Sequence, residues 1–316
     1  MDVSVIIVSW NTCDILHDCL ASVYAQSKDV RFEVIVIDNG SSDGSVEMVK
    51  REFAGATVIE NPENRGFAPA NNQGFRIARG RYLLLLNSDT VVLDGAIDKS
   101  VAFADAHPEA AVVGCRALNP DRTVQPTCFM FPSVLNMLLG SIYLNKLLPR
   151  SKFFGRAQMT WWDKNDVREV DVVAGCFMLI RREVIEHVGV LDEQFFMYGE
   201  ETDLCYRVKR AGWKVLFTPG AQIIHLHGAS SKRMKPEMMS QLHASILLFL
   251  KKHKGWPAYI LGCLLVGLFF LLRTPYWLGH AILSRSTRDR DMLTTKAYAK
   301  TAFKALLGWR ALCFRR

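Results

Sequence analysis

The chain lacks several patterns that would assign it to common protein classes. Its eight cysteines stand singly, mostly inside apolar runs, and none forms the Cys-x-x-Cys pair of a zinc site. We therefore expect buried free thiols in a reducing compartment. The first nine residues carry no basic segment ahead of a hydrophobic stretch. We accordingly expect no secretory signal and a cytoplasmic start.

Two nucleotide-related signatures are also missing. No Gly-x-Gly-x-x-Gly follows the first apolar run, which argues against a nicotinamide-dependent oxidoreductase. No zinc finger or RNP-type aromatic motif accompanies the basic residues, which argues against nucleic-acid binding.

Acidic residues are nearly absent from the C-terminal part of the chain. From Lys251 to Arg316 there are thirteen Lys and Arg against only Asp289 and Asp291, so this segment has a net charge of +11. The whole chain has a net charge of +8. The first 250 residues therefore carry −3. Because the basic residues flank apolar segments, an anionic lipid surface is the expected partner of this tail.

Short apolar runs alternate with helical patterns in the first half of the chain. Expected strands cover 3–8, 34–37, 57–59 and 82–86, and expected helices start near Ile15 and cover 45–53 and 69–79. Asn11 or Thr12 is placed to cap the first helix. This alternation predicts an α/β fold with a mostly parallel sheet flanked by helices.

The second half divides into an irregular region, a return to order and an apolar tail. Four prolines interrupt residues 120–168, which are candidates for covering the site or reading an acceptor. Residues 258–272 are apolar, and the apolar stretch continues to Leu283 if Arg273 is tolerated. Lys296, Lys300 and Lys304 then mark a basic amphipathic helix. We expect a catalytic domain over 1–235 and a membrane-associated helical tail over 236–316.

Polar side chains close three of the expected strands, where α/β sheets bind ligands. They are Ser9 and Asn11, Asp38 and Asn39, and Asn87 and Asp89. Turn chemistry alone accounts for residues 39–42. Asp38 and Asp89 each end an apolar strand, which favours a functional role for both.

Two further groups have the chemistry of a metal site and of a general base. Asp89 supplies a carboxylate, and His225 supplies a nitrogen suited to Mn²⁺ unless it is an ordinary loop histidine. Glu200, Glu201 and Asp203 place three carboxylates directly after an apolar segment. Crowding beside apolar surface is expected to raise the pKa of one of them, as a general base requires.

Taken together, the motifs resemble those of family 2 glycosyltransferases, in particular the rhamnosyltransferase-like enzymes of bacterial envelope polysaccharide synthesis. The similarity runs from about residue 3 to residue 254. It rests on segments 6–11, 36–44, 61–67 with Asn71 and Asn72, 85–89, 173–181, 189–193, 198–206 and His225 with 228–230.

The resemblance implies a GT-A fold, an inverting sugar transfer and a bound Mg²⁺ or Mn²⁺. By matched position, Asp38 would hold the nucleoside, and Asp89 with His225 would bind the metal. Glu201 would be the base, with Glu200 as its competitor, since this chain has Glu where Asp is commoner. The other expected donor-binding residues are Ser9, Trp10, Asn11, Asn64, Arg65, Asn71, Asn87 and Ser88. Asn87 replaces the first acid of the usual Asp-x-Asp, so metal binding would depend mainly on Asp89, His225 and the donor phosphates.

The resulting hypothesis is an enzyme at the cytoplasmic face of the plasma membrane. It would move a sugar, such as rhamnose, from a nucleotide-diphosphate donor to a lipid-linked or other envelope glycan. The alternative is a non-catalytic scaffold of the same fold that is recruited to the membrane.

Overall fold

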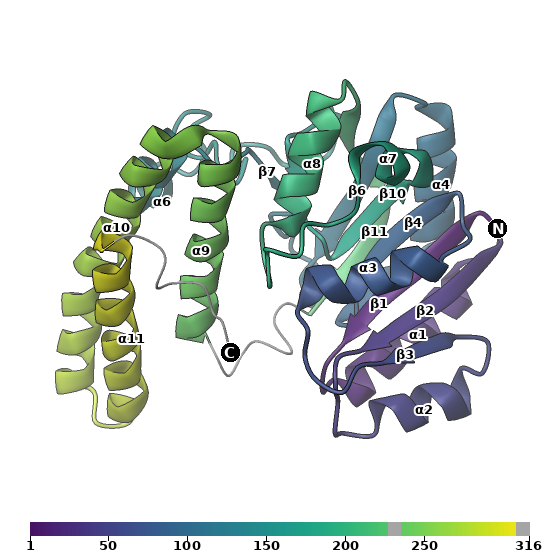
Figure 1. Cartoon of the computed structure of the whole chain (residues 1–316), viewed down its shortest axis with the longest axis horizontal. Helices are drawn as coiled ribbons and strands as arrows, with labels where there is room; N and C mark the ends of the chain where they lie inside the picture. The colour runs from purple at the N-terminus through teal and green to yellow at the C-terminus, as the bar shows by residue number, and fades with distance from the viewer. Residues whose placement is uncertain (227–234, 308–316) are drawn as a thin grey trace. The chain divides into compact units, whose positions relative to one another are not determined.

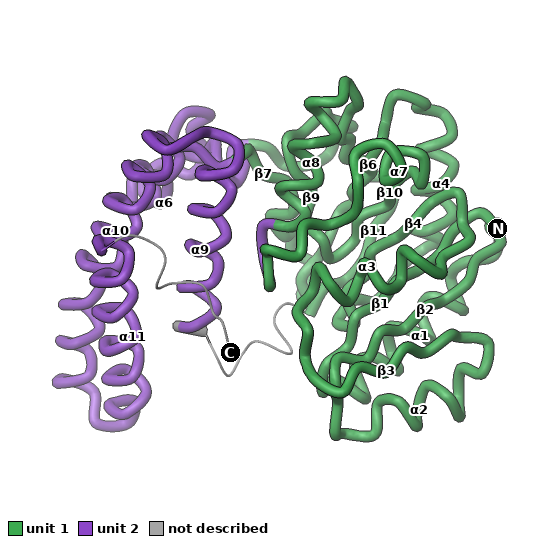
Figure 2. The backbone as a smooth tube through the Cα atoms, in the orientation of Figure 1, with its two compact units in different colours: residues 1–131, 162–196, 200–230 green, residues 132–161, 197–199, 231–316 purple. Residues whose placement is uncertain are grey.

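The computed structural model describes residues 1–226 and 235–307. The chain forms two compact units, coloured separately in Figure 2. The first, here called the sheet unit, comprises residues 1–131, 162–196 and 200–230. The second, the helical unit, comprises residues 132–161, 197–199 and 231–316. Part of the irregular region therefore belongs to the same unit as the tail.

The sheet unit is built on a nine-stranded sheet whose first four strands are parallel. They are β1 (Val3–Ser9), β2 (Phe32–Asp38), β3 (Thr57–Glu60) and β4 (Tyr82–Asn87), in the spatial order β3-β2-β1-β4. All four coincide with expected strands. Continuous apolar runs are typical of parallel strands, since helices cover both of their faces.

The sheet continues as β10-β6-β11-β5. The bounds are β5 (Thr90–Leu93), β6 (Ala110–Leu118), β10 (Phe177–Arg181) and β11 (Lys214–His225). β10 is antiparallel to both of its neighbours, β4 and β6, whereas β6 and β11 are parallel. Three two-residue strands complete the unit: β8 (Arg168–Glu169) pairs with β11, and β7 (Cys128–Phe129) pairs with β9 (Val172–Val173).

Helices cover both faces of this sheet (Figure 1). α1 (Cys13–Gln26), α2 (Ser45–Glu52) and α4 (Ala96–Ala106) contribute to one continuous core with β1, β2 and β4. α3 (Phe67–Ile77) lies on the opposite face, where a Cβ at Gly74 would come within 2.6 Å of Ile6 Cγ2. α7 (Arg182–Val188) packs on β10, and α8 (Glu200–Arg210) packs on β9 and β11. The unit is thus a three-layer α/β/α structure.

The start of α1 differs from expectation in one detail. Thr12 occupies the N-cap position, but its side chain makes no capping hydrogen bond. The carboxylate of Asp43 accepts from the Cys13 amide instead, at 2.8 Å. A side chain 30 residues away thus satisfies the free amide of the helix, which local sequence rules do not anticipate.

The helical unit contains five helices among its described residues: α5 (Val134–Ser141), α6 (Leu144–Leu147), α9 (Lys235–His253), α10 (Gly255–Leu283) and α11 (Arg288–Leu306). The apolar stretch does continue through Arg273 to Leu283, with Pro275 inside the helix. α10 is the one described helix that is long and apolar enough to cross a membrane.

Of the cysteines, the structure describes seven, all free, and six of them are buried. This confirms the expected thiols for the described part of the chain.

Candidate active site

The carboxyl ends of three neighbouring strands bring the polar residues predicted from sequence together. Ser9 at the end of β1 pairs in register with Asp38 at the end of β2. On the other side of β1, Val8 pairs with Asn87 at the end of β4. The three strand ends therefore form one edge, as expected for a ligand site in a parallel sheet.

Asp38 is buried, and its two carboxylate oxygens differ. Oδ2 accepts hydrogen bonds from the amides of Gly40 at 3.1 Å and Ser41 at 2.8 Å. Oδ1 is buried without a hydrogen-bond partner. Because buried polar atoms are nearly always satisfied, this oxygen is suited to accept from a ligand. Asp38 therefore both fixes the turn and presents an open acceptor.

The residues that follow β1 connect the loops around this edge. The Ser9 hydroxyl lies 3.0 Å from that of Thr12, which donates to the Ser88 hydroxyl at 3.4 Å. Asn11 has a positive φ of 52° and accepts from the Ser42 amide at 2.8 Å. Trp10, which lies between Ser9 and Asn11 in the sequence, is half-buried. Ser9, Asn11 and Ser88 thus shape the loops, whichever ligand they contact.

The predicted residues in α3 and in the loop before it fall into two groups. Asn64 accepts from the Gly66 amide at 3.0 Å, and buried Asn71 donates to the carbonyl of Phe67 at 2.9 Å. These two side chains therefore stabilise the loop and the helix that follows it. Arg65 is exposed, so its guanidinium is accessible to an anionic ligand.

Asp89 and His225 come together from different strands. β5 begins directly after Asp89, and Thr90 pairs in register with His225 at the end of β11. His225 Nε2 lies 3.2 Å from Asp89 Oδ1 and 3.5 Å from Asn87 Nδ2. Asp89 and His225 are both buried, at 7% and 8% exposure. The motif around His227 and residues 228–230 lies outside the described residues.

Gln125 fixes the orientation of the His225 ring, and sequence reasoning missed it. Its amide nitrogen donates to Asn119 Oδ1 at 2.8 Å and to the His225 carbonyl at 2.6 Å. The amide oxygen therefore faces His225 Nδ1, at 3.0 Å, and Nδ1 must carry a hydrogen to donate to it. This interaction directs the Nε2 lone pair of a neutral imidazole toward Asp89.

This arrangement fits a bound cation. A nitrogen lone pair and a carboxylate oxygen 3.2 Å apart repel each other unless a proton or a metal ion lies between them. A carboxylate and an imidazole suit Mn²⁺, and a carboxylate suits Mg²⁺. No group of three His, Cys, Asp or Glu side chains within 1–226 and 235–307 is placed to hold a metal. Within those residues Asp89 and His225 are the two candidate ligands, and donor phosphate oxygens and water suit the same cation.

We expect Gln125→Ala to weaken Mn²⁺ binding about 10- to 100-fold, because loss of an outer partner frees the histidine ring. Titration of the free Mn²⁺ signal by electron paramagnetic resonance measures this affinity. Gln194→Ala, at an exposed position of the same unit, is the control. Unchanged Mn²⁺ affinity in a Gln125→Ala protein that melts cooperatively would contradict the role of Gln125.

Two adjacent carboxyl groups begin α8. Glu200 is buried at 4% exposure, whereas Glu201 is half-buried. Burial raises the pKa of Glu200 well above its usual range, and the neighbouring Glu201 charge and a side-chain hydrogen bond to Glu201 raise it further. The pKa of one acid of the cluster is thus raised, in the direction expected from the sequence. Glu201 is the more accessible carboxyl of the pair.

The third acid of this cluster has a structural role. Asp203 is fully buried and accepts from Arg207 Nε at 2.7 Å. The same guanidinium donates to the carbonyls of Val188, Gly189 and Val190. Asp203 therefore helps to attach α8 to the loop after α7, which fixes the position of the Glu200–Glu201 pair.

The raised pKa of Glu200 makes stability depend on pH. The folded protein holds a proton that the unfolded chain releases above the usual Glu pKa of 4.5. The free energy of unfolding should therefore fall as pH rises above this value, by at most about 1.4 kcal/mol per pH unit. Glu200→Gln should lose this dependence, so its melting temperature relative to the parent should increase from pH 5 to pH 8. A constant difference in melting temperature between Glu200→Gln and the parent from pH 5 to pH 8 would contradict this prediction.

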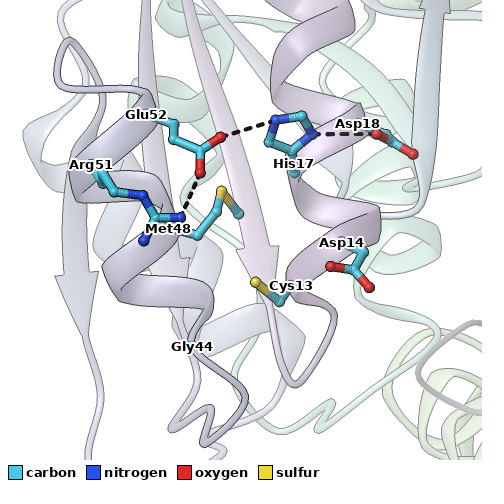
Figure 3. A pocket seen from close by; sticks show the side chains of 8 residues that line it. All are labelled: Cys13, Asp14, His17, Asp18, Gly44, Met48, Arg51 and Glu52. Carbon is cyan, nitrogen blue, oxygen red and sulfur yellow. Dashed lines mark hydrogen bonds and ion pairs between the residues drawn. The ribbon is translucent and has the colours of Figure 1, made fainter.

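A shallow pocket of about 390 Å³ lies elsewhere in the sheet unit, between α1 and α2 (Figure 3). None of the sequence-predicted site residues lines it. Its charged groups largely pair with one another: His17 Nε2 lies 3.2 Å from Glu52, which also accepts from Arg51 at 2.6 Å. We assign no role to this pocket.

Comparison with known proteins now identifies the family. The sequence model described as "Glycosyl transferase family 2" matches residues 4–189, more than half of the chain. The chain belongs to glycosyltransferase family 2. The match includes the strand-end edge with Asp38, Asn87 and Asp89. The protein is therefore a nucleotide-sugar glycosyltransferase, and the scaffold alternative is not favoured.

Curated relatives of this family 2 enzyme include two rhamnosyltransferases. The N-acetylglucosaminyl-diphospho-decaprenol L-rhamnosyltransferase of Mycobacterium tuberculosis is 27% identical over 237 residues, covering 71% of this chain and 76% of that protein. Rhamnosyltransferase WbbL of Escherichia coli is 25% identical over 237 residues, covering 71% of this chain and 83% of that protein.

Among solved structures, the mannosyltransferase PcManGT of Pyrobaculum calidifontis, in complex with GDP-Man and Mn²⁺, superposes with a TM-score of 0.60 and 17% identity. It covers 98% of this chain and 87% of that chain. GalNAc-T7 with UDP, GalNAc and Mn²⁺ gives a TM-score of 0.55 and 18% identity over 78% of this chain and 47% of that chain. These similarities confirm the GT-A-like fold.

Proposed function

We propose that this glycosyltransferase transfers rhamnose or a hexose from a nucleotide-diphosphate donor to an envelope glycan carried on a lipid diphosphate. The observation that carries the proposal is the strand-end edge, where the Asp89–His225 pair lies on the same sheet edge as Asp38. The mycobacterial and Escherichia coli relatives are both rhamnosyltransferases, which favours rhamnose, and the mycobacterial one is named for an N-acetylglucosaminyl-diphospho-decaprenol substrate, which favours a polyprenyl-diphosphate acceptor.

The donor would lie along the strand-end edge. Asp38 Oδ1 would accept a hydrogen bond from the nucleoside, beside the Ser9–Asn11 loop. Asp89 and His225 would hold Mg²⁺ or Mn²⁺, which when bound compensates the charge that develops on the diphosphate leaving group. Exposed Arg65 would contribute a further positive charge for the phosphates.

Glu201 would be the general base. It removes the proton from the acceptor hydroxyl while the oxygen forms a bond to the anomeric carbon and the bond from that carbon to the diphosphate breaks. The attack comes from the side opposite the leaving group, so the anomeric configuration inverts. Burial and the neighbouring Glu201 raise the pKa of Glu200, and a side-chain hydrogen bond joins the two groups, so a protonated Glu200 would donate to Glu201. Glu200 is therefore a positioning residue in this scheme.

The enzyme would work at the cytoplasmic face of the plasma membrane, where nucleotide sugars are available. The basic tail supports this location, because residues 251–316 contain thirteen Lys and Arg but only two acidic residues, and such a segment is attracted to anionic lipids. The helical unit would hold the enzyme close to a lipid-borne acceptor.

Thermal melting of the detergent-purified protein tests the donor. The panel comprises nucleotide-diphosphate sugars with different bases and sugars, each with Mn²⁺, with Mg²⁺ or with a chelator. A ligand that binds only the folded state raises the melting temperature, by mass action. We expect a metal-dependent rise with one donor. No rise with any donor at millimolar concentration, in a protein that melts cooperatively, would overturn the proposal.

A further inference from the structure

The surface of α10 carries an apolar stripe along its whole length. Exposed positions spaced by whole helical turns form it: Trp256, Ile260, Leu264, Leu271, Leu278 and Ile282, each at 40% exposure or more. At 1.5 Å per residue this stripe is about 39 Å long. Only 33% of the most apolar window of the helix is buried inside the structure. An exposed apolar surface of this length marks an interaction site.

The side of α10 that carries Gly262 and Gly267 packs against other helices of the same unit, whereas Leu261, Leu272, Tyr276 and Leu283 widen the exposed apolar surface beside the stripe. A Cβ at Gly262 would come within 2.7 Å of Leu247 on α9, and one at Gly267 within 2.6 Å of Leu306 on α11. Close approach at these glycines indicates tight helix–helix contacts with α9 and α11. α10 therefore presents one free face, unlike a solitary membrane-spanning helix.

Arg273 does not interrupt the stripe, because its charge is turned into the helical unit. It is 8% exposed, and its guanidinium donates to the carbonyls of Gly140 and Ser141 at the end of α5. The same group stacks on the rings of Tyr143 and Phe269, at 3.8 and 3.5 Å from the ring centres. The partners that an arginine needs when it leaves water are all inside the protein.

α11 covers the second half of α10 in an antiparallel arrangement. His280 Nδ1 lies 2.7 Å from the buried Asp291 carboxylate at one end of the pair, and Gly267 meets Leu306 at the other. Lys296 and Lys300 on α11 are exposed. A span of about 20 residues of α10 would carry part of α11 into the hydrocarbon. Crossing the bilayer would thus place α11 lysines in lipid, which is costly.

The charges around the stripe suit an anionic membrane surface. Exposed basic residues lie at both ends of α10: Lys251, Lys252 and Lys254 before it, and Arg285, Arg288 and Arg290 after it. Asp289 is the one exposed acid among described residues 251–307. At the start of the helix, Lys251 Nζ lies 5.0 Å from the centre of the Trp256 ring, a pairing suited to the headgroup region.

We propose that α10 and α11 form a monotopic anchor. The apolar stripe of α10 lies in the plane of an anionic bilayer and enters one leaflet, with the basic groups at both of its ends on the same headgroup layer. The chain does not cross the membrane at α10, so the turn between α10 and α11 stays on the same side of the membrane as the sheet unit. This inference deepens the membrane location proposed above and does not depend on which sugar is transferred.

Sidedness tests the anchor in membranes of cells that express the full chain. Ser286→Cys, in the exposed α10–α11 turn, and Asp29→Cys, in the sheet unit, each add one accessible thiol to the parent. A membrane-impermeant maleimide–polyethylene glycol should modify both in inverted vesicles and neither in spheroplasts. If Ser286→Cys is modified from one side of the membrane and Asp29→Cys from the other, α10 crosses the bilayer and the proposal is overturned.

Vesicle flotation tests the stripe itself. We expect Leu264→Glu/Leu271→Glu to bind vesicles of phosphatidylcholine and phosphatidylglycerol at least about tenfold more weakly, because two inserted side chains are lost. Ile77→Glu, at an apolar residue of the sheet unit with 44% exposure, is the matched control. Unchanged flotation of the double variant would overturn the proposal. A double variant that binds vesicles like the parent but changes from a dimer to a monomer would also overturn it, because the stripe would then contact a second copy of the chain.

An activity measurement on the same samples distinguishes failure of the anchor from failure of the proposed function. Release of the nucleotide diphosphate from the donor is measured in parallel with labelling and flotation. Sugar transfer with the turn on the opposite side would overturn the anchor alone. A correctly placed turn with no turnover of any donor would overturn the proposed function alone.

Discussion

Glu201→Gln is expected to lower kcat by about 10²- to 10⁴-fold, the usual contribution of a general base. The substitution keeps the size of the side chain but removes the group that accepts the proton of the acceptor hydroxyl. Donor binding should survive, because the donor residues lie on the strand-end edge and not on α8. Turnover at saturating donor and acceptor, together with the donor-induced rise in melting temperature, measures the two effects separately.

Glu200→Gln distinguishes the two candidate bases. Gln is a neutral mimic of the protonated Glu200, and Glu200 is buried with a raised pKa. We expect kcat to fall by less than about tenfold, since base catalysis by Glu201 remains. Exposed Glu47→Gln in the same unit is the control for handling. A large loss in Glu200→Gln with near-parental activity in Glu201→Gln would reverse the assignment.

The first half of the fold was predictable because its signals are local. β1, β2 and β4 are almost wholly apolar, and each ends in a polar residue at the sheet edge. Strands buried on both faces require such runs, and the following helices carry their own periodicity. The parallel order and the meeting of Ser9, Asp38 and Asn87 follow from that pattern.

The second half could not be predicted to the same detail because long-range pairing determines it. β11 is one strand of twelve residues with a register shift between Thr218 and Gln222, whereas its sequence is broken by Pro219 and Gly220. Nothing local shows that β10 runs antiparallel between β4 and β6. Its orientation depends on where the intervening chain returns to the sheet.

The site shows the same division. Asp89 was recognisable because it follows a strand within a motif, but Gln125 lies in an irregular segment 100 residues before His225. Its role depends on three simultaneous hydrogen bonds that no spacing rule encodes. Asp203 was similarly indistinguishable from its neighbours until Arg207 proved to be its partner.

Asp89→Ala is expected to reduce kcat/KM by about three orders of magnitude and to abolish the metal-dependent part of donor binding. Asp89 Oδ1 lies 3.2 Å from His225 Nε2, and Asn87 stands where a second acid would assist it. No third His, Cys, Asp or Glu side chain among described residues completes the group. The loss should therefore exceed that in an enzyme with two acids in this motif.

Mn²⁺ titration, melting without metal and turnover together separate the loss of a metal ligand from general damage to the fold. Mn²⁺ titration by electron paramagnetic resonance should show loss of the tight site in Asp89→Ala, while melting without metal remains cooperative. His225→Ala should weaken Mn²⁺ binding in the same direction, and exposed Asp29→Ala should not. If Asp89→Ala keeps parental Mn²⁺ affinity and turnover, the metal does not bind at the Asp89–His225 pair. The leaving diphosphate would then have to be compensated by protein cations such as Arg65.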